Sequence, residues 1–392
     1  MKKFFTLLLF TLLISTFPSF SKAQSIDSVR VSLLTCSPGT EIYSLFGHTA
    51  IRYENPAKDM DIVFNYGIFS FNTPNFIWRF VKGETDYQLG VTPFVYFESE
   101  YYMRGSAVFE QQLNLLPEEK EKLWESLETN YRIENRVYRY NYFFDNCTTR
   151  ARDKIEESLN GELVYQEDNR ILSFRDIVHQ YTEGHEWAEF GIDLCLGSKA
   201  DETVGYRQEM FAPFYLMAAI DSAKVIKGDI ECKLVVGTKE IVPAEVEQDV
   251  TNFWFTPLQA SCLLFLFVLI VSIYGIWKKK MLWWLDILLF GAAGLTGCVI
   301  AFLVFFSVHP TVTPNYLLIL FHPIHLIYLP FMVYRAVRKK KDAYHLINFI
   351  VLTLFIALWG IIPQSFNLAV LPLALCLLTR SVSQLILYRK IK

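Results

Sequence analysis

The chain has 392 residues, of which 52% are hydrophobic, a larger share than an ordinary soluble domain carries. Its formal net charge of −3 combines +3 in residues 1–23, +10 in residues 258–392 and therefore −16 in residues 24–257. The acidic central region argues against nucleic-acid binding, which relies on clustered Lys and Arg to neutralise phosphates. The large hydrophobic share instead predicts the lipid bilayer as a partner.

Residues 1–23 have the pattern of a secretory signal peptide. Lys2 and Lys3 precede the apolar run Phe4–Phe17, and small residues follow up to Ala23. The apolar run is too short to serve as a stable transmembrane anchor. We therefore predict that residues 24–257 form an exported domain.

The exported region mixes strand and helix patterns, which predicts an α+β fold. A helical turn is expected at Thr40–Phe46 and an extended segment at Tyr138–Phe144. Strand patterns lie at Val29–Thr35, His48–Tyr53, Ile62–Phe69 and Ala107–Leu115. Helical patterns with start or stop signals lie at Asn75–Lys82, which Gly83 ends, and at Pro117–Asn130.

Cys147 stands at the predicted start of another helix. Asn146 suits the N-cap, and Ala151, Ile155 and Leu159 recur at the spacing of one buried helical face. A thiol at a helix N-terminus has its thiolate stabilised by unpaired N–H groups and by the helix dipole. The same N–H groups can hold the oxyanion of a tetrahedral intermediate. We therefore interpret Cys147 as a candidate nucleophile.

One of the three histidines in the exported region has to act as the general base for this thiol. His48 begins a predicted strand and is the first candidate, whereas pairing with His185 would follow the order of papain. A structural role for Cys147 is the competing interpretation, since exported cysteines often form disulfides, and Cys195 and Cys232 are candidates for one. No close cluster with metal-ligand spacing is evident, so we predict neither a metal nor another cofactor.

Residues 258–392 predict five transmembrane helices. The spans are Leu258–Trp277, Met281–Ser307, Tyr316–Tyr334, Leu346–Ile362 and Phe366–Tyr388, each long enough to cross about 30 Å of hydrocarbon. Basic residues gather in alternate loops, which places those loops and the C-terminus in the cytoplasm. The exported domain then lies in the periplasm, and the protein in the inner membrane.

The third span carries polar residues. Asn315 and His322 are seven residues apart and would share one helical face. These side chains either bond to neighbouring helices or line a lateral site for a lipid head group. Arg380 in the fifth span is expected to reach the cytoplasmic edge.

Several long motifs resemble those of one family. GHTAIRY at residues 47–53 and YNYFFDNCTTRARD at residues 140–153 are similar to sequences of the Lnb family of bacterial lipoprotein N-acyltransferases. FNYGIF at residues 64–69, FVKGETDYQLG at residues 80–90 and the five-span tail extend the resemblance over nearly the whole mature chain.

The resemblance implies a circularly permuted papain-like domain, in which the strand with the catalytic His precedes the helix with the catalytic Cys. It implies that an acyl chain moves from a membrane glycerolipid, through a Cys147 thioester, to the N-terminal amine of a diacylglyceryl-cysteine lipoprotein. A polar residue beside His48 would orient the ring. Asn65 is the first candidate, with Asp61 and Glu41 as alternatives.

Four cations are candidates for contact with a lipid phosphate, and they are Arg52, Arg79, Lys82 and Arg150. Two other functions remain open on the residues alone. A cysteine peptidase or amidase of the cell wall would use the same thiol, and a non-enzymatic envelope protein would use Cys147 only structurally.

Overall fold

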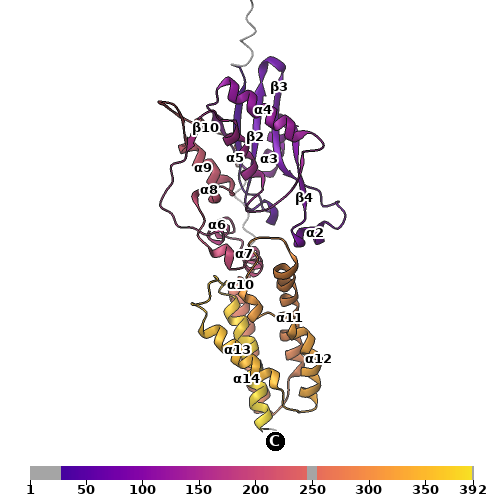
Figure 1. The fold of residues 1–392 in the computed structure, drawn as a ribbon. Coiled ribbons are helices and arrows are strands. Elements are labelled where there is room, and N and C mark those ends of the chain that lie inside the picture. The colour runs from indigo at the N-terminus through magenta and orange to yellow at the C-terminus, as the bar shows by residue number, and fades with distance from the viewer. Residues whose placement is uncertain (1–27, 245–253, 391–392) are drawn as a thin grey trace, which may run out of the picture.

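The structure, a computed structural model, describes residues 28–244 and 254–390. The predicted signal peptide, residues 1–23, lies outside the described residues. A mixed α/β domain sits on one end of a bundle of long helices, and the C-terminus lies at the far end of the bundle (Figure 1). The predicted α+β class followed by a helical membrane region is therefore confirmed.

A seven-stranded antiparallel sheet forms the centre of the α/β domain, with the order β10-β5-β1-β2-β3-β4-β6. Its strands are β1 (Arg30–Cys36), β2 (His48–Asn55), β3 (Met60–Ile68), β4 (Asp86–Pro93), β5 (Val108–Leu113), β6 (Val137–Arg139) and β10 (Val235–Val242). The four strands expected from alternating patterns correspond to β1, β2, β3 and β5. Strands β4 and β10 were not predicted, and β6 covers only part of the expected extended segment.

Helices cover both faces of this sheet, because alternate side chains of each strand point to opposite sides. Leu33 belongs to the larger core under α4, α5 and α9, whereas Leu34 belongs to a smaller core under α3. These helices are α3 (Phe94–Arg104), α4 (Pro117–Tyr131), α5 (Cys147–Ser158) and α9 (Pro213–Ser222). Helix α4 matches the predicted helix, with Leu123 and Leu127 fully buried.

Two shorter helical elements were also expected. The turn at Thr40–Phe46 contains the 3-10 helix η2 (Ile42–Ser44), and a second 3-10 turn, η3 (Pro56–Lys58), joins β2 to β3. Helix α2 (Phe76–Lys82) ends at Gly83, whose φ of +78° places it in the left-handed region that favours glycine.

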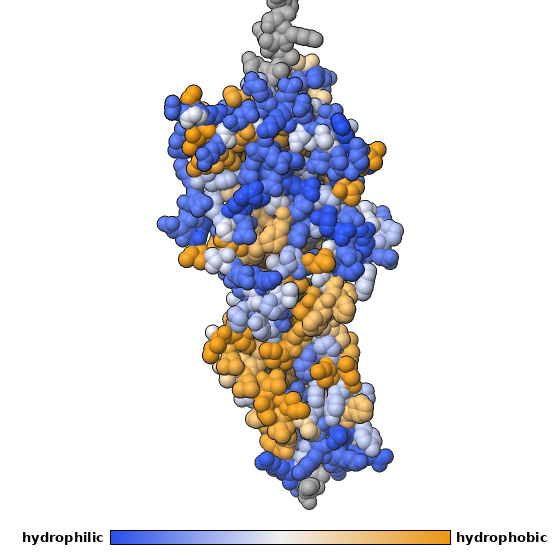
Figure 2. Space-filling view, viewed as in Figure 1, coloured by the Kyte–Doolittle hydropathy of each residue, from blue (hydrophilic) through white to orange (hydrophobic). Residues whose placement is uncertain are grey.

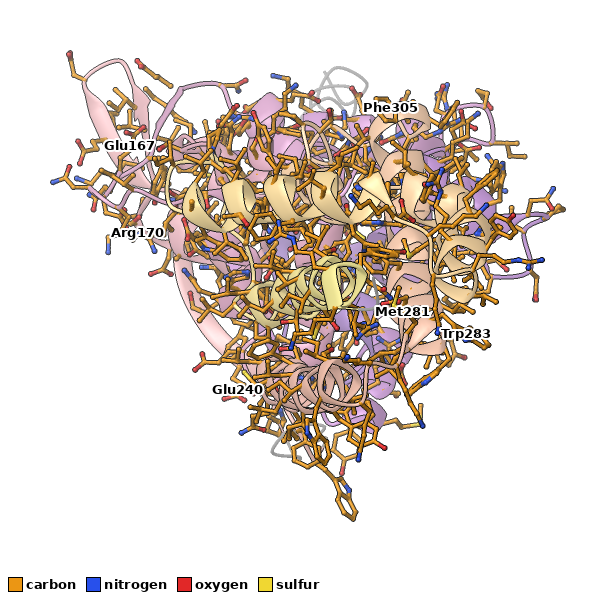
Figure 3. All side chains as sticks on the ribbon, turned by 90° about the horizontal axis from the view of Figure 1, so that it is seen from below. Glu167, Arg170, Glu240, Met281, Trp283 and Phe305 are labelled. Carbon is orange, nitrogen blue, oxygen red and sulfur yellow. The ribbon has the colours of Figure 1, made fainter. Side chains whose placement is uncertain are left out.

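The last third of the α/β domain was not predicted in detail. It contains α6 (Phe174–Tyr181), α7 (Glu186–Cys195), η4 (Ser198–Asp201) and α8 (Tyr206–Glu209), and a small sheet of β7 (Glu162–Val164), β8 (Lys224–Lys227) and β9 (Ile230–Lys233). Seen from the membrane end, Glu167 and Arg170 lie to one side of the helix bundle (Figure 3).

The membrane region contains four helical segments that are long and apolar enough to cross a bilayer, and they are α10 (Pro257–Trp277), α11 (Trp283–Phe306), the segment Tyr316–Val337 and α14 (Val370–Lys390). Hydrophobic side chains cover this region on the visible face, and a hydrophilic cap lies at the far end (Figure 2).

Four of the five predicted spans are confirmed as long apolar helical segments, and the remaining one is shorter than expected. The predicted span Leu346–Ile362 corresponds to α13 (Ala343–Ala357), an apolar helix of 15 residues that ends in turns. At about 1.5 Å per residue such a helix is shorter than the ~30 Å hydrocarbon core. The cytoplasmic C-terminus depended on an odd number of spans and therefore stays a prediction.

The third span is broken rather than continuous. A 3-10 helix, η5 (Tyr316–Ile319), precedes a non-helical segment, and α12 (Ile324–Val337) begins after Pro323. Asn315 and His322 therefore do not share one helical face as expected. Proline disfavours helix in the residue before it, which accounts for the break.

Arg380 does not reach the cytoplasmic edge as predicted. Its side chain is fully buried and donates to both carboxylate oxygens of Asp286, at 2.7 and 3.1 Å. Ser272 and the Leu282 carbonyl also accept from Arg380, and Gln384 donates to Asp286. The bundle therefore contains a hydrogen-bonded ion pair between α11 and α14.

Backbone hydrogen bonds join the α/β domain to the membrane helices at two places. At the first, the Gly197 N–H donates to the Thr311 carbonyl and the Ser198 N–H to the Pro314 carbonyl, both at 2.8 Å. At the second, the Val308 N–H donates to the Lys82 carbonyl at the end of α2. Figure 1 shows α7 and α2 at this junction.

Candidate active site

Cys147 is the first residue of α5, and Asn146 caps this helix as predicted. The Asn146 Oδ1 accepts the N–H groups of Thr148 and Thr149, both at 2.9 Å. The Asn146 Nδ2 donates to two backbone carbonyls at 2.8 and 2.9 Å, and the Asn146 N–H donates to the Thr149 hydroxyl at 2.8 Å. A cap held by this many bonds fixes the backbone at the thiol.

The expected apolar face of α5 is present. Ala151, Ile155 and Leu159 are all buried in the larger core of the sheet, and α5 contacts β2 and β3. This packing fixes the rotation of the helix about its axis. The thiol of Cys147 is consequently held beside the first residues of β2.

His48 opens β2 directly after Gly47, which has a φ of +73°. A Cβ at Gly47 would lie 2.4 Å from the Cys36 carbonyl oxygen, so only glycine fits there. The His48 Nε2 lies 2.5 Å from the Asn65 Oδ1 on the neighbouring strand β3. Because Nε2 serves this bond, Nδ1 is the nitrogen left to face the thiol.

The Cys147 thiol and the His48 imidazole interact, and each changes the pKa of the other. Burial alone would raise the pKa of Cys147, but the charge and hydrogen bond of His48, the Thr49 N–H and the Thr148 hydroxyl lower it to about 7. Burial alone would lower the pKa of His48, whereas Cys147 and Asn65 raise it above its usual range. Both directions favour a thiolate beside an imidazolium.

The other cysteines of the described α/β domain lack this setting. Cys36, Cys195 and Cys232 are free thiols, so the candidate disulfide between Cys195 and Cys232 is absent. Burial raises the pKa of both Cys36 and Cys195. Cys147 is thus the cysteine whose surroundings favour the reactive form.

Two family models match the chain. The Lnb N-terminal periplasmic domain matches residues 16–185, and the Lnb transmembrane domain matches residues 248–391. The chain belongs to the Lnb family. Searches of curated proteins and of solved structures found no match.

The Lnb match agrees with the two-part architecture and identifies a membrane protein with a periplasmic N-terminal domain. His48, Asn65 and Cys147 all lie within the matched periplasmic domain. The prediction of a permuted papain-like fold stays a prediction, although the strand with His48 does precede the helix with Cys147 in this Lnb chain.

Alternative partners for the thiol and the imidazole lie elsewhere in this Lnb chain. His185 stands at the start of α7, a helix that contacts α10 and α11 of the membrane region. Asp61 accepts two hydrogen bonds from Arg52, at 2.7 and 2.8 Å. Glu41 lines a cavity that His48 also borders, but its side chain is exposed.

The four predicted lipid-binding cations all have acidic partners. Arg52 pairs with Asp61 and Glu110, Arg79 with Asp86, Lys82 with Glu84, and Arg150 with Asp145. Of the four, Arg150 lies nearest to the thiol in sequence, and its guanidinium also lies 3.6 Å from the ring centre of Tyr138. Contact with a lipid phosphate stays a prediction for all four.

Asn315 lies at the junction between the two domains, and His322 lies in the membrane region. Asn315 is buried, donates to the Leu194 carbonyl at 2.9 Å and accepts from Gln364 at 3.2 Å. His322 stacks on His325 with ring centres 3.8 Å apart. The Asn315 bonds favour the first interpretation of the polar residues, namely contact with neighbouring segments.

A cavity of about 290 Å³ borders the imidazole. His48, Tyr43, Ser44, Tyr101 and Arg104 are among its lining residues. The cavity leaves room for a small group beside the imidazole. It forms where the loop before β2 meets α3, a tertiary contact that the sequence patterns did not predict.

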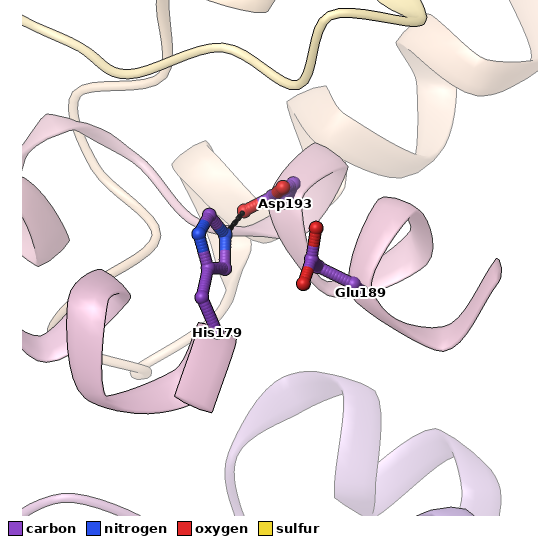
Figure 4. A group of neighbouring side chains, drawn as sticks. All are labelled: His179, Glu189 and Asp193. Atoms are coloured by element: carbon purple, nitrogen blue, oxygen red, sulfur yellow. Dashed lines mark hydrogen bonds and ion pairs between the residues drawn. The ribbon is translucent and has the colours of Figure 1, made fainter. Parts of the chain in front are cut away.

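Three side chains that lie away from Cys147 have the composition of a metal site. His179, Glu189 and Asp193 bring potential ligand atoms within 4.8 Å of one another (Figure 4). However, one Asp193 oxygen accepts from Arg175 at 2.6 Å and from His179 at 2.9 Å, and the other accepts from Asn367 at 3.1 Å. We assign the cluster to the docking of α7 on the membrane region.

Sequence reasoning missed three residues around the thiol. Thr49 and Thr148 each follow a member of the reacting pair directly, which was a signal available in the sequence. Tyr138 has a buried hydroxyl without a hydrogen-bond partner among the described residues. No local pattern indicated that this hydroxyl would lie near Cys147.

Proposed function

We propose that the chain is a lipoprotein N-acyltransferase that works through a thioester on Cys147. The observation that carries the proposal is a thiol at the start of a capped helix whose pKa His48 lowers to about 7, within an Lnb periplasmic domain. In the proposed reaction a fatty acyl chain leaves a membrane glycerolipid and reaches the amine of a diacylglyceryl-cysteine lipoprotein. Cys147, His48 and Asn65 are the proposed catalytic set.

In the first half-reaction His48 takes the proton of the Cys147 thiol, and the thiolate attacks the carbonyl carbon of the acyl ester. The carbonyl electrons form an oxyanion, which the N-terminus of α5 stabilises. The ester C–O bond then breaks, and the His48 imidazolium protonates the departing alkoxide. A Cys147 thioester and a lyso-lipid result.

In the second half-reaction the free amine of the lipoprotein attacks the thioester carbonyl. A second oxyanion forms and collapses, the C–S bond breaks, and the thiolate leaves. His48 accepts the surplus proton of the amine and returns it to the thiolate. Asn65 holds the imidazole in one orientation throughout, because its Oδ1 accepts from Nε2.

The position of the pair favours a lipid substrate over a soluble cell-wall peptide. In the sheet, His48 lies opposite Cys36, the last residue of β1. Strand β1 begins at the end of the domain farthest from the membrane helices (Figure 1), so it ends, at Cys36, nearer to them. Beyond β3, the chain continues into α2, whose Trp78 ring packs on Phe302 of α11 with ring centres 4.9 Å apart. The reacting pair therefore lies at the membrane-facing end of the sheet.

The proposal is tested with the full-length protein in liposomes that contain a glycerophospholipid with a labelled acyl chain. A diacylglyceryl-cysteine peptide with a free amine serves as acceptor, and mass spectrometry follows both the labelled thioester and the acylated peptide. The intact protein should form both products. Cys147→Ala should form neither, and His48→Ala should form both far more slowly.

Cys232→Ala is the matched control, since Cys232 is also a free thiol of the periplasmic domain. It should acylate the peptide at the normal rate. Acylation that persists in Cys147→Ala would overturn the proposal. Cleavage of a cell-wall peptide by the wild type, without transfer of the label, would favour the amidase function instead.

A further inference from the structure

The helix that begins at Cys147 has fewer free N–H groups than its position suggests. The Asn146 side chain already accepts the N–H groups of Thr148 and Thr149. Among the described residues, no carbonyl or side chain accepts the N–H of Cys147 itself. The α5 terminus therefore offers an oxyanion one backbone donor, and a second donor is needed for strong stabilisation.

Tyr138 on β6 has the properties of such a donor. Its side chain is 7% exposed, and its hydroxyl has no hydrogen-bond partner among the described residues. A buried hydroxyl without a hydrogen-bond partner lowers the stability of the folded protein, so its presence needs an explanation. A ligand atom that arrives during the reaction would supply the missing partner.

The hydroxyl borders the same space as the thiol. Gly67 has a φ of +89°, and a Cβ built there would lie 3.7 Å from the Cys147 Cβ and 3.9 Å from the Tyr138 hydroxyl oxygen. The absence of a side chain at Gly67 thus leaves a gap that both groups border. An acyl carbonyl bonded to the Cys147 sulfur would have its oxygen in or beside this gap.

We propose that the Tyr138 hydroxyl is the second oxyanion donor, which acts together with the N–H of Cys147. This inference rests on the proposed function, because it concerns the tetrahedral intermediates of that reaction. Tyr138 donates a hydrogen bond to the negatively charged oxygen and transfers no proton. The carbonyl oxygen gains the electron pair when sulfur attacks and returns it when the leaving group departs.

The surroundings keep the hydroxyl in its donating form. Burial, together with the negative charge of Cys147, raises the pKa of Tyr138 well above its usual value. The Arg150 guanidinium lies over the Tyr138 ring, and Asp145 holds Arg150 through two hydrogen bonds at 2.5 and 2.8 Å. This stacking restricts the position of the ring, so the hydroxyl is preorganised before substrate binds.

A second tyrosine provides a matched control. Tyr142 also has a buried hydroxyl without a partner among the described residues. Its ring, however, packs against Phe46 and Phe143, with ring centres 5.0 and 4.9 Å away, in a separate aromatic cluster. The Tyr142 hydroxyl is not among the atoms within 4 Å of a Cβ built at Gly67. Tyr142→Phe therefore removes a buried hydroxyl that does not border the gap.

The test compares the wild type, Tyr138→Phe and Tyr142→Phe in the full-length protein. One assay measures the rate of Cys147 acylation by p-nitrophenyl butyrate, whose attack by any thiol passes through an oxyanion. The other measures alkylation of Cys147 by iodoacetamide across pH, a displacement that forms no oxyanion. Tyr138→Phe should slow acylation by roughly 100-fold, a typical effect of losing one oxyanion donor, and leave the alkylation profile unchanged.

Tyr142→Phe should match the wild type in both assays. Equal acylation rates for Tyr138→Phe and the wild type would overturn the inference, as would an equal loss in both variants. A change in the alkylation profile of Tyr138→Phe would also overturn it, because the residue would then act on the thiol. The butyrate assay needs no lipid and no lipoprotein, so it tests the oxyanion donor alone. Failure of the proposed function would appear only in the lipid-transfer assay.

Discussion

The hydroxyls of Thr49 and Thr148 lie 3.1 Å apart, both fully buried, and join the residue after His48 to the residue after Cys147. The bond connects strand β2 to helix α5 at the point where the imidazole meets the thiol. The Thr148 hydroxyl also contributes to the lowered pKa of Cys147. One side-chain contact thus fixes the spacing of His48 and Cys147 and contributes to the ionisation of the thiol.

Thr148→Val should damage this contact while keeping the shape of the side chain. It leaves the Thr49 hydroxyl buried without a partner, which costs about 1–3 kcal/mol of unfolding free energy. It should also raise the pKa of Cys147, because one hydrogen bond to the thiolate is lost. Denaturation in detergent and alkylation across pH measure the two effects. The double variant Thr49→Val with Thr148→Val should recover part of the stability, and failure to recover it would show that the hydroxyls are not coupled.

The rate of Cys147 alkylation should rise as pH increases through about 7, because the thiolate is the reactive form and the pKa of Cys147 is lowered to about 7. Acyl transfer should fall again at higher pH, where His48 loses the proton that the leaving group needs. In His48→Ala the main cause of the lowered pKa is gone, and burial should move the midpoint to higher pH. His185→Ala is the control and should keep the wild-type midpoint. A shifted midpoint in His185→Ala would restore the papain-order alternative.

Asn65→Ala should slow acyl transfer by roughly 10- to 100-fold, since a misoriented imidazole loses the geometry of proton transfer. The pKa of His48 should fall, because the hydrogen bond of Asn65 raises it. Comparison of kcat with KM separates the positioning role from substrate binding, and kcat should carry the loss. Asp61→Ala, which removes a partner of Arg52 instead, should leave the pH profile of transfer unchanged.

Local patterns in the sequence predicted the thiol end of the site and not its surroundings. The cap at Asn146, the buried face of α5 and the start of β2 depend on residues close in sequence, so their spacing was informative. Tyr138 depends instead on the register of β6 against β4 and on the backbone at Gly67. Such contacts arise only when distant segments meet.

In the membrane region too, the features that depend on residues close in sequence could be predicted. Hydrophobic runs predicted the long spans, because hydropathy is a local property. The break between η5 and α12 could also have been predicted, since Pro323 stands inside the third run. The pair of Arg52 with Glu110 could not be predicted, because it joins strands that lie far apart in the sequence. The other acidic partners of the four cations lie within nine residues of them and were therefore available in the sequence.

Gly197→Ala should loosen the periplasmic domain from the membrane helices. A Cβ at Gly197 would lie 2.5 Å from the Pro314 carbonyl oxygen and 2.7 Å from the Val312 carbonyl oxygen, and backbone atoms cannot move aside cheaply. Protease cleavage at the junction should therefore become faster. The matched control is Gly191→Ala in α7, where a new Cβ meets nothing within 4 Å and should stabilise the helix by about 0.5–1 kcal/mol. Equal cleavage of both variants would contradict the proposed docking contact.

Arg380→Met should destabilise the membrane region strongly, because it leaves the Asp286 carboxylate buried without its cation. Removal of one partner from a buried ion pair costs about 3–5 kcal/mol, whereas replacement of both by apolar residues is often close to neutral. The double variant Arg380→Met with Asp286→Leu should therefore be more stable than Arg380→Met alone. Thermal unfolding in detergent measures the three proteins, and Arg389→Met, at an exposed position of the same helix, should match the wild type. If the double variant is less stable than Arg380→Met alone, the buried pair acts through its hydrogen bonds to Ser272 and Gln384 rather than through the coupling of its two charges.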